Sequence, residues 1–282
     1  MQISLLRKIG GIQKQCKSLI NLGVSGGSLE DIFVFSYFIF KNETLPKKIF
    51  IDIDPWTLKF NMDSRYGAYM TEYNKMNGIL GIKHKNKVVS YKEKVLKNLI
   101  NWEYFYTSIK TLKNKKLKTL DYLFNMNIEK PKHSYSYLEG YDKSIILADG
   151  AHIYSHSYIE KQAKLNPSIP IGGGNYKING KSYDVLAIKS LEKLLKLYKL
   201  KGVEVSFILT PYHPNVFQKG ITEPVKHMKE VKKVITEISQ KYNIKIFGSF
   251  FPEDIGCQKN EFLDFMHPTT ECLTKIDFTS LE

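Results

Sequence analysis

The feature that most constrains the fold is the alternation of short apolar segments with long amphipathic ones. Residues 47–56 (KKIFIDIDPW), 203–214 (VEVSFILTPYHP) and 244–251 (IKIFGSFF) have the length and composition of buried strands, and a proline stops the first two. Residues 18–27 (SLINLGVSGG) suggest one more short strand that ends in glycines. Strands separated by helices with short connections predict a parallel sheet with right-handed crossovers.

Helical periodicity fills the intervals between these strands. Residues 2–17, 29–42, 185–202 and 223–243 repeat apolar side chains at helical spacing, and the third of these segments is expected to end at Gly202. Residues 57–143 are rich in Lys, Asn and Tyr and predict a helical insertion, after which residues 144–158 return to a strand and a loop. We therefore expect a single doubly wound α/β domain over 1–282 with one insertion.

The amino-acid composition limits the classes of partner that the chain is expected to bind. The net charge of +14 comes almost entirely from lysine, with Arg7 and Arg65 the only arginines in the 282 residues. Nucleic-acid recognition depends on bidentate arginine, so we predict a solvated lysine surface and no nucleic-acid partner. The sequence has no run of about 18 apolar residues, so we expect no membrane span in this chain. Of the three cysteines, Cys257 and Cys272 are expected to be free buried thiols that pair only in an oxidising compartment.

A candidate for proton transfer lies near the C-terminus, in residues 262–273 (FLDFMHPTTECL). Asp264 and His267 are three residues apart, so both side chains can lie on the same side of one turn. The carboxylate can then accept a hydrogen bond from Nδ1 of His267, which leaves Nε2 as a general base. The pair follows the last predicted strand, at the carboxyl edge of the sheet where α/β proteins bind ligands. The alternative is a helix start with a surface histidine.

A second candidate lies in residues 21–32 (NLGVSGGSLEDI). Asn21, Gly23, Ser25 and Gly26 fall between a predicted strand and a predicted helix. Glycines there let the backbone approach a ligand and point N–H groups at it, as an oxyanion hole requires. The alternative is a tight turn whose glycines serve packing alone.

Together, Asn-x-Gly-x-Ser-Gly early in the chain and Asp-x-x-His late in it resemble the SGNH (GDSL-like) hydrolase superfamily. The match is closest to the esterase and acyl-transfer branch that acts on envelope polysaccharides, and the segments 202–214 and 149–158 are similar to that branch as well. The resemblance implies a three-layer α/β/α sandwich with a parallel sheet. It implies that Gly26 donates its N–H to an oxyanion and that Asp264 and His267 complete the catalytic group.

The chain departs from this pattern in two places. The resemblance implies an asparagine donor after the next strand, where this chain has Asp54, Pro55 and Trp56. An ionised Asp54 would repel an oxyanion. The resemblance also implies a nucleophilic serine in a Gly-x-Ser turn at the end of a first strand, one helix before Gly26. Counting back places that serine at or before Met1, so we expect an N-terminally truncated form of a longer protein, inactive as it stands.

A rival nucleophile lies inside the chain. Residues 23–27 (GVSGG) fit Gly-x-Ser-x-Gly, the nucleophile elbow of α/β-hydrolases, with Ser25 as the attacking residue. Those enzymes have several strands before the elbow and keep their acid and histidine well apart in sequence. The short spacing of Asp264 and His267 therefore favours the SGNH order.

Further residues are candidates for substrate contact. His152 and His156 have i, i+4 spacing but lack the intervening glutamate of a zinc helix, so we expect them to line a site and predict no metal. His213 follows a strand and is expected in the same cleft, and Trp56 is a candidate platform for a sugar, with a core position as its alternative. His84, His133 and His227 lie in lysine-rich segments and are expected to be solvated.

The prediction is thus an SGNH-like serine esterase or O-acyltransferase that acts on a sugar or a cell-envelope polysaccharide without a cofactor. The alternative is a non-catalytic carbohydrate- or anion-binding protein that keeps the fold. The resemblance implies an envelope-facing or periplasmic full-length form, with an upstream membrane anchor. A chain that really starts at Met1 would be cytoplasmic.

Overall fold

The computed structural model describes residues 20, 22–24, 26–60, 65–83, 181–218, 220 and 222–278, and it describes the backbone alone at 145–146 and 152–153. Its centre is a three-stranded parallel sheet in the order β1 (Lys48–Asp52), β4 (Glu204–Leu209), β5 (Lys245–Gly248). All three strands fall in predicted segments. A parallel sheet combined with helices is compatible with the predicted α/β class. The short antiparallel pair β2 (Ile145–Ile146) and β3 (His152–Ile153) lies in the segment predicted to return to a strand.

The predicted strand over 18–27 is wrong for the residues described there. Residues 22–24, 26 and 27 have no strand structure, because the backbone already turns between Val24 and Gly27 to enter the next helix. The N–H of Gly27 donates to the carbonyl of Val24 at 3.1 Å, and Gly26 has a positive φ of 62°. Gly26 and Gly27, which were expected to end a strand, therefore belong to the turn that precedes the next helix.

The described helices lie where periodicity predicts them. These are α3 (Leu29–Lys41), α9 (Val185–Leu200) and α10 (Glu223–Tyr242), and Gly202 follows α9 with a φ of 71°. A 3₁₀ turn (Arg65–Tyr69) leads into α4 (Met70–Leu80). Short 3₁₀ turns at Pro214–Val216, Pro252–Asp254 and Lys259–Glu261 and a final helical turn, α11 (Thr270–Leu273), complete the described elements.

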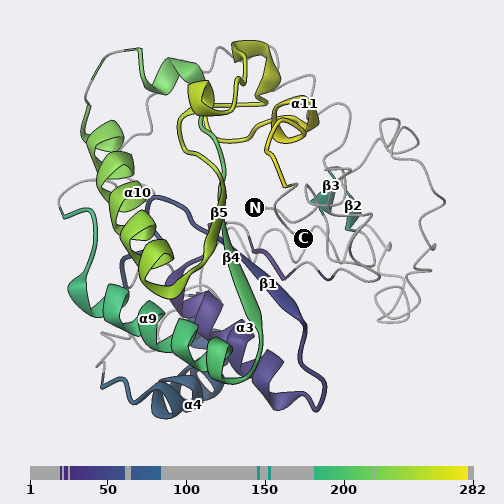
Figure 1. Cartoon of the computed structure of the whole chain (residues 1–282), viewed down its shortest axis with the longest axis vertical. Helices are drawn as coiled ribbons and strands as arrows, with labels where there is room; N and C mark the ends of the chain where they lie inside the picture. Colours follow the sequence, from purple (N-terminus) through teal and green to yellow (C-terminus); the bar gives the residue numbers. More distant parts are fainter. Residues whose placement is uncertain are drawn as a thin grey trace, which may run out of the picture.

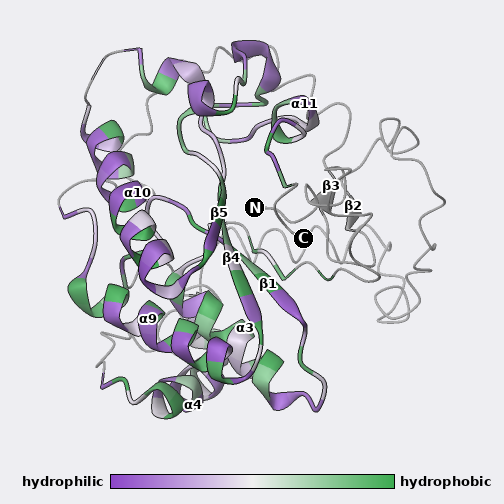
Figure 2. Ribbon diagram, viewed as in Figure 1, coloured by the Kyte–Doolittle hydropathy of each residue, from purple (hydrophilic) through white to green (hydrophobic). Residues whose placement is uncertain are grey.

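Helices α3, α4, α9 and α10 lie together on one side of the sheet, and α11 lies apart from them (Figure 1). Alternate strand residues point into that interface, and it forms the main core with the apolar stripes of the helices, which are visible in Figure 2. Its members include Ile51, Phe207, Leu191 and Val231. On the opposite face, Phe247 stacks on Phe278 with ring centroids 4.8 Å apart, so the C-terminal segment packs against the back of β5.

The start of the predicted insertion shares this core. Leu58 and, in α4, Tyr73 and Met76 are fully buried in the same cluster as the sheet residues. Residues 57–60 and 66–82 thus pack with the domain rather than apart from it. The remainder of the insertion, from residue 84 to 143, lies outside the described residues and stays a prediction.

No helix in the described ranges combines the length and the apolar character that crossing a bilayer requires.

Candidate active site

Asp264 and His267 lie in one tight turn of the loop between β5 and α11. Oδ1 of Asp264 accepts the backbone N–H groups of Met266 and His267, both at 2.9 Å. Oδ2 of Asp264 lies 2.5 Å from Nδ1 of His267. The two side chains are about one-fifth exposed, at 21% and 22%. The predicted contact between the carboxylate and Nδ1 is therefore present, and solvent can reach it.

The surroundings keep this carboxyl ionised. Burial acts to raise the pKa of Asp264, but the His267 ring and the backbone N–H groups of Met266 and His267 outweigh it, so the pKa lies below its usual value. An ionised Asp264 accepts a hydrogen bond from Nδ1–H, which favours the tautomer with a lone pair on Nε2. The pair therefore has the electronic arrangement of an oriented general base.

The loop around the pair is closed by its own backbone. The N–H of Leu263 donates to the carbonyl of His267 at 2.7 Å, and Phe262 bridges to Pro268 in antiparallel fashion. The N–H of Thr269 donates to the carbonyl of Glu261 at 2.8 Å. These contacts hold the two ends of the turn together, so the Asp264–His267 geometry does not depend on the side chains alone.

His213 lies beneath this loop and is only 2% exposed. Its Nδ1 accepts the N–H of Asn215 at 3.0 Å, and its backbone N–H donates to the carbonyl of Phe265 at 2.9 Å. Its ring packs edge-on against Phe262, with centroids 5.3 Å apart. Burial lowers the pKa of His213, so the ring is neutral. The structure thus brings His213 to the predicted site but places it as a buried support.

The glycine turn is the second part of the candidate site. Gly26 adopts a left-handed conformation that a glycine takes without strain, and Ser28 then caps α3 by accepting the N–H of Asp31 at 3.3 Å. The carboxylate of Asp31 accepts the N–H of Ser28 in return, at 3.0 Å. The predicted contributors Asn21 and Ser25 lie outside the described residues.

Trp56 joins the turn after β1 to the glycine turn. Its Nε1–H donates to the carbonyl of Gly27 at 3.0 Å, and the side chain is 2% exposed. Trp56 is therefore a core residue, the alternative to a sugar platform. Its ring is buried, and its indole N–H is used in the hydrogen bond to the glycine turn. The hydrogen bond holds the carbonyl of Gly27, the residue that follows Gly26.

Asp54, at the same turn, is half-buried and lies near Asp52. Burial and the nearby charge of Asp52 raise the pKa of Asp54 well above its usual range, although the Tyr212 hydroxyl lowers it. Asp52 itself accepts a hydrogen bond from Thr210 at 3.2 Å. The neutral form of Asp54 is therefore favoured, and a neutral carboxyl does not repel an oxyanion as an ionised one would.

Neighbour contacts place both parts at the carboxyl edge of the sheet. Trp56, just after β1, reaches Gly27, and His213, just after β4, reaches Phe265 in the loop of Asp264 and His267. Tyr212 donates its N–H to the carbonyl of Phe250, just after β5, at 3.0 Å. Parallel strands end at one edge, so the glycine turn and the acid–imidazole pair lie at the same end of the molecule.

His227 contradicts its sequence-based expectation. It was expected to be solvated because lysines flank it, but it is 2% exposed in α10, with Nε2 2.8 Å from the carbonyl of Pro55. The signal that could have revealed it is its position one helical turn before the buried Val231. His227 thus supports the turn that carries Asp54 and Trp56.

The structure does not describe the side chains of the remaining histidines. The backbone of His152 lies in β3, and its side chain is not described. His84, His133 and His156 lie outside the described residues. Within the described part of the chain, no group of three or more His, Cys, Asp or Glu side chains is arranged to hold a metal ion.

The cysteine expectation is also wrong. Cys257 and Cys272 form a disulfide, with Cα atoms 5.0 Å apart, where free thiols were expected. The loop between them folds back on itself, which brings together two cysteines that are 15 residues apart in sequence. The disulfide encloses the segment that carries Asp264 and His267.

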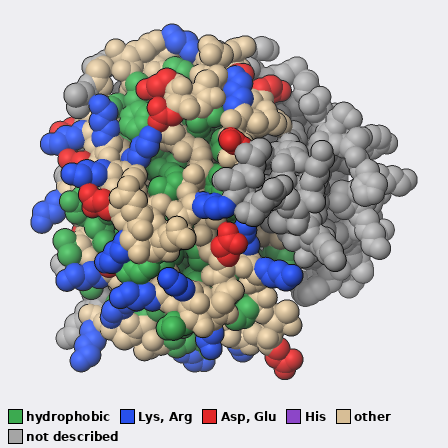
Figure 3. Space-filling model, viewed as in Figure 1, with side chains coloured by type: hydrophobic (Ala, Val, Ile, Leu, Met, Phe, Trp, Pro, Cys, Tyr) green, Lys and Arg blue, Asp and Glu red, His purple; other side chains and the backbone are tan. Residues whose placement is uncertain are grey.

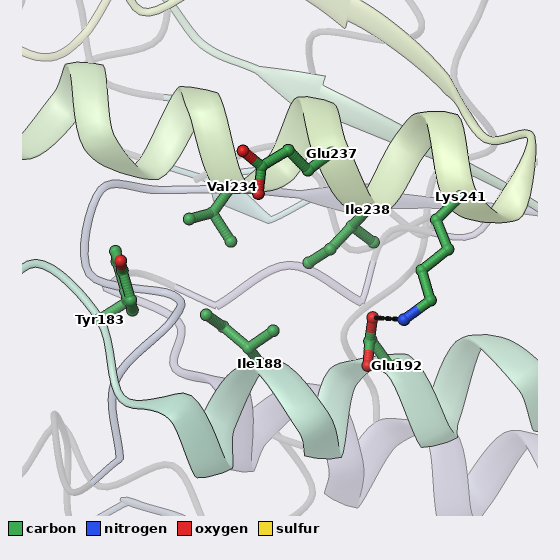
Figure 4. Close-up of a pocket in the computed structure, with 7 residues that line it drawn as sticks. All are labelled: Tyr183, Ile188, Glu192, Val234, Glu237, Ile238 and Lys241. Carbon is green, nitrogen blue, oxygen red and sulfur yellow. Dashed lines mark hydrogen bonds and ion pairs between the residues drawn. The ribbon is translucent and has the colours of Figure 1, made fainter.

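Two other surfaces lie away from this site. A pocket of about 280 Å³ opens between α9 and α10 and is crossed by an ion pair between Lys241 and Glu192 (Figure 4). None of the residues predicted for the site lines it. Lysine side chains are scattered over the face shown in Figure 3 with acidic side chains among them, as expected for a solvated surface.

Comparisons with known proteins add no assignment. The chain matches no protein-family model, no curated protein and no solved structure.

Proposed function

We propose that this chain is an SGNH-like serine esterase or O-acyltransferase whose substrate is an acyl ester on a sugar or a cell-envelope polysaccharide. The observation that carries the proposal is the contact between Asp264 and Nδ1 of His267 in a partly exposed turn at the carboxyl edge of a parallel sheet. A structural histidine such as His213 is 2% exposed, whereas the side chain of His267 is 22% exposed and can be reached by solvent.

The proposed chemistry assigns one role to each group. A serine attacks the acyl carbon, Nε2 of His267 takes the serine proton and later returns it to the leaving alcohol, and Asp264 stabilises the imidazolium. The N–H of Gly26 donates to the oxyanion, and its left-handed turn supports that placement. Asp54, held neutral, occupies the position of the second donor.

The attacking serine is proposed to lie in the Gly-x-Ser turn that the SGNH resemblance implies one helix before Gly26, on a strand beside β1. Among the described residues, β1 pairs with β4 on one side and with no strand on the other. A strand added there would make β1 internal, and it would extend the sheet toward the doubly wound α/β/α sandwich that we propose for the complete fold. Ser25 is the alternative nucleophile.

Turnover of p-nitrophenyl acetate tests this function. We expect a protein extended upstream by the native reading frame to hydrolyse the ester, and His267→Ala to lower kcat by roughly 10²–10⁴-fold. Lys241→Ala, in the pocket between α9 and α10 and away from this site, is a control that should leave kcat unchanged.

Equal rates for the extended wild type and His267→Ala would contradict the enzyme proposal. Binding of an acidic or neutral glycan that His267→Ala leaves intact, without turnover, would instead support the non-catalytic carbohydrate-binding alternative.

A further inference from the structure

We infer that the Cys257–Cys272 disulfide, together with His213, positions the Asp264–His267 pair. The three side chains act through the loop and not on a substrate, so they are positioning residues. The inference deepens the proposed function, because it names what holds the proposed base in place, but its test does not require ester turnover.

The disulfide closes a loop that contains the whole pair. Cys257 is 5% exposed and Cys272 is fully buried, and they form a small cluster with Phe262, separate from the main core. Phe262 begins the turn that ends at Pro268. The covalent link therefore closes both ends of a segment whose middle, at Phe265 and Met266, packs against the main core.

His213 supports the same loop from within. It contacts three of its residues: the backbone of Lys259 hydrogen-bonds to the ring, Phe262 packs on the ring, and the carbonyl of Phe265 accepts its backbone N–H. Because Nδ1 accepts the N–H of Asn215, the neutral ring carries its proton on Nε2. His213 thus binds its own turn through Nδ1 and holds the loop through its backbone N–H and its ring contact with Phe262.

The loop has two kinds of constraint, one covalent and one through His213, and the acid–imidazole pair lies between them. Catalytic groups lose effectiveness when their supporting residues leave them loose by as little as about 1 Å. A structural disulfide also persists in oxidising compartments and is rare in reducing ones. The arrangement therefore points to a protein that matures where disulfides form.

Nuclear magnetic resonance of the full chain tests the inference through the low-field proton of His267 Nδ1–H and the ring nitrogen shifts that report its tautomer. A dithiol reductant transfers two electrons and two protons to the disulfide and is itself oxidised to a cyclic disulfide. We expect the oxidised protein to show the Nδ1–H signal, and reduction to shorten its exchange lifetime by about tenfold or more. The midpoint of thermal unfolding should fall by about 5–10 °C.

Variants separate the two supports. Cys257→Ala with Cys272→Ala should reproduce the reduced spectrum without reductant, and His213→Phe should weaken the signal while keeping the ring contact with Phe262. Cys16→Ala is the matched control for thiol chemistry and should leave the signal unchanged. Backbone amide shifts of α9 and α10 show in each sample that the domain is folded.

An unchanged His267 signal in a folded sample whose two thiols are shown by mass to be free would overturn the inference. So would a native protein that already carries both thiols free. If the signal responds as expected but no ester is hydrolysed, the proposed function fails while the positioning role stands.

Discussion

His227 shows how a single buried side chain can tie distant segments together. The ring lies between α10 and the turn after β1, with Nε2 at the carbonyl of Pro55 and Nδ1 buried without a hydrogen-bond partner. Burial lowers the pKa of His227 to about 4, and the charge of Lys59 acts in the same direction. The folded protein therefore resists protonation of this ring.

This shift predicts acid-dependent stability. The pKa of an unfolded histidine is 6.5, so the stabilisation is complete above that pH. As the pH falls from 6.5 toward 4, the unfolded chain binds a proton that the folded protein does not, and the free energy of unfolding decreases. Urea unfolding at pH 7 and pH 4.5 should show that the wild type loses about 2–3 kcal/mol more than His227→Gln. Equal losses in the two proteins would contradict the assignment.

Gly248, at the end of β5, allows a close approach that a larger residue prevents. Its φ is 77°, and a Cβ built on it would lie 2.4 Å from the carbonyl oxygen of Leu209. We expect Gly248→Ala to lower the free energy of unfolding by about 2–4 kcal/mol. Gly78, inside α4, has open space around its Cα, so Gly78→Ala should raise it by up to about 1 kcal/mol. Urea unfolding of both variants checks the contrast, and a tolerated Gly248→Ala would count against the described backbone.

At the scale of elements, the spacing of apolar residues and the positions of Gly and Pro predicted most of the described strands and helices. The apolar runs around β1, β4 and β5 and the stripes of α9 and α10 predict these elements within a few residues. The strand over 18–27 failed because a short apolar run next to glycines is compatible with either a strand or a turn. Periodicity also gives no information on tertiary contacts, so the burial of His227 was not predicted, and the pairing of Cys257 with Cys272 was only the alternative to free thiols.

Trp56 links two turns, and the link can be tested. Trp56→Phe keeps an aromatic ring in the core but removes the hydrogen bond to the Gly27 carbonyl. We expect a loss of about 1–3 kcal/mol in the free energy of unfolding and faster amide exchange at Gly26 and Gly27. Hydrogen exchange followed by mass spectrometry measures the second effect. A local loss of protection in 22–28, with α9 unchanged, is the expected pattern, and uniform change or none would show that the two turns are not coupled.

At the scale of the whole molecule, one core joins the sheet, four helices and the turns at its carboxyl edge. The candidate site was predictable in part, because the spacing of Asp264 and His267 predicts the contact that the structure contains. The supports of the site were not, since they depend on contacts across the chain: His213 with Phe265, and Trp56 with Gly27. Sequence patterns indicate local pairs such as Asp264 and His267, whereas the fold determines which distant residues hold them.

The most direct test of serine chemistry at this edge is labelling of the upstream-extended protein with a fluorophosphonate, followed by mass spectrometry of the labelled peptide. The account predicts one labelled serine, in the proposed Gly-x-Ser turn, and a labelling rate that falls by about 10²-fold or more in His267→Ala. A label on Ser25, or labelling that does not depend on His267, would contradict it.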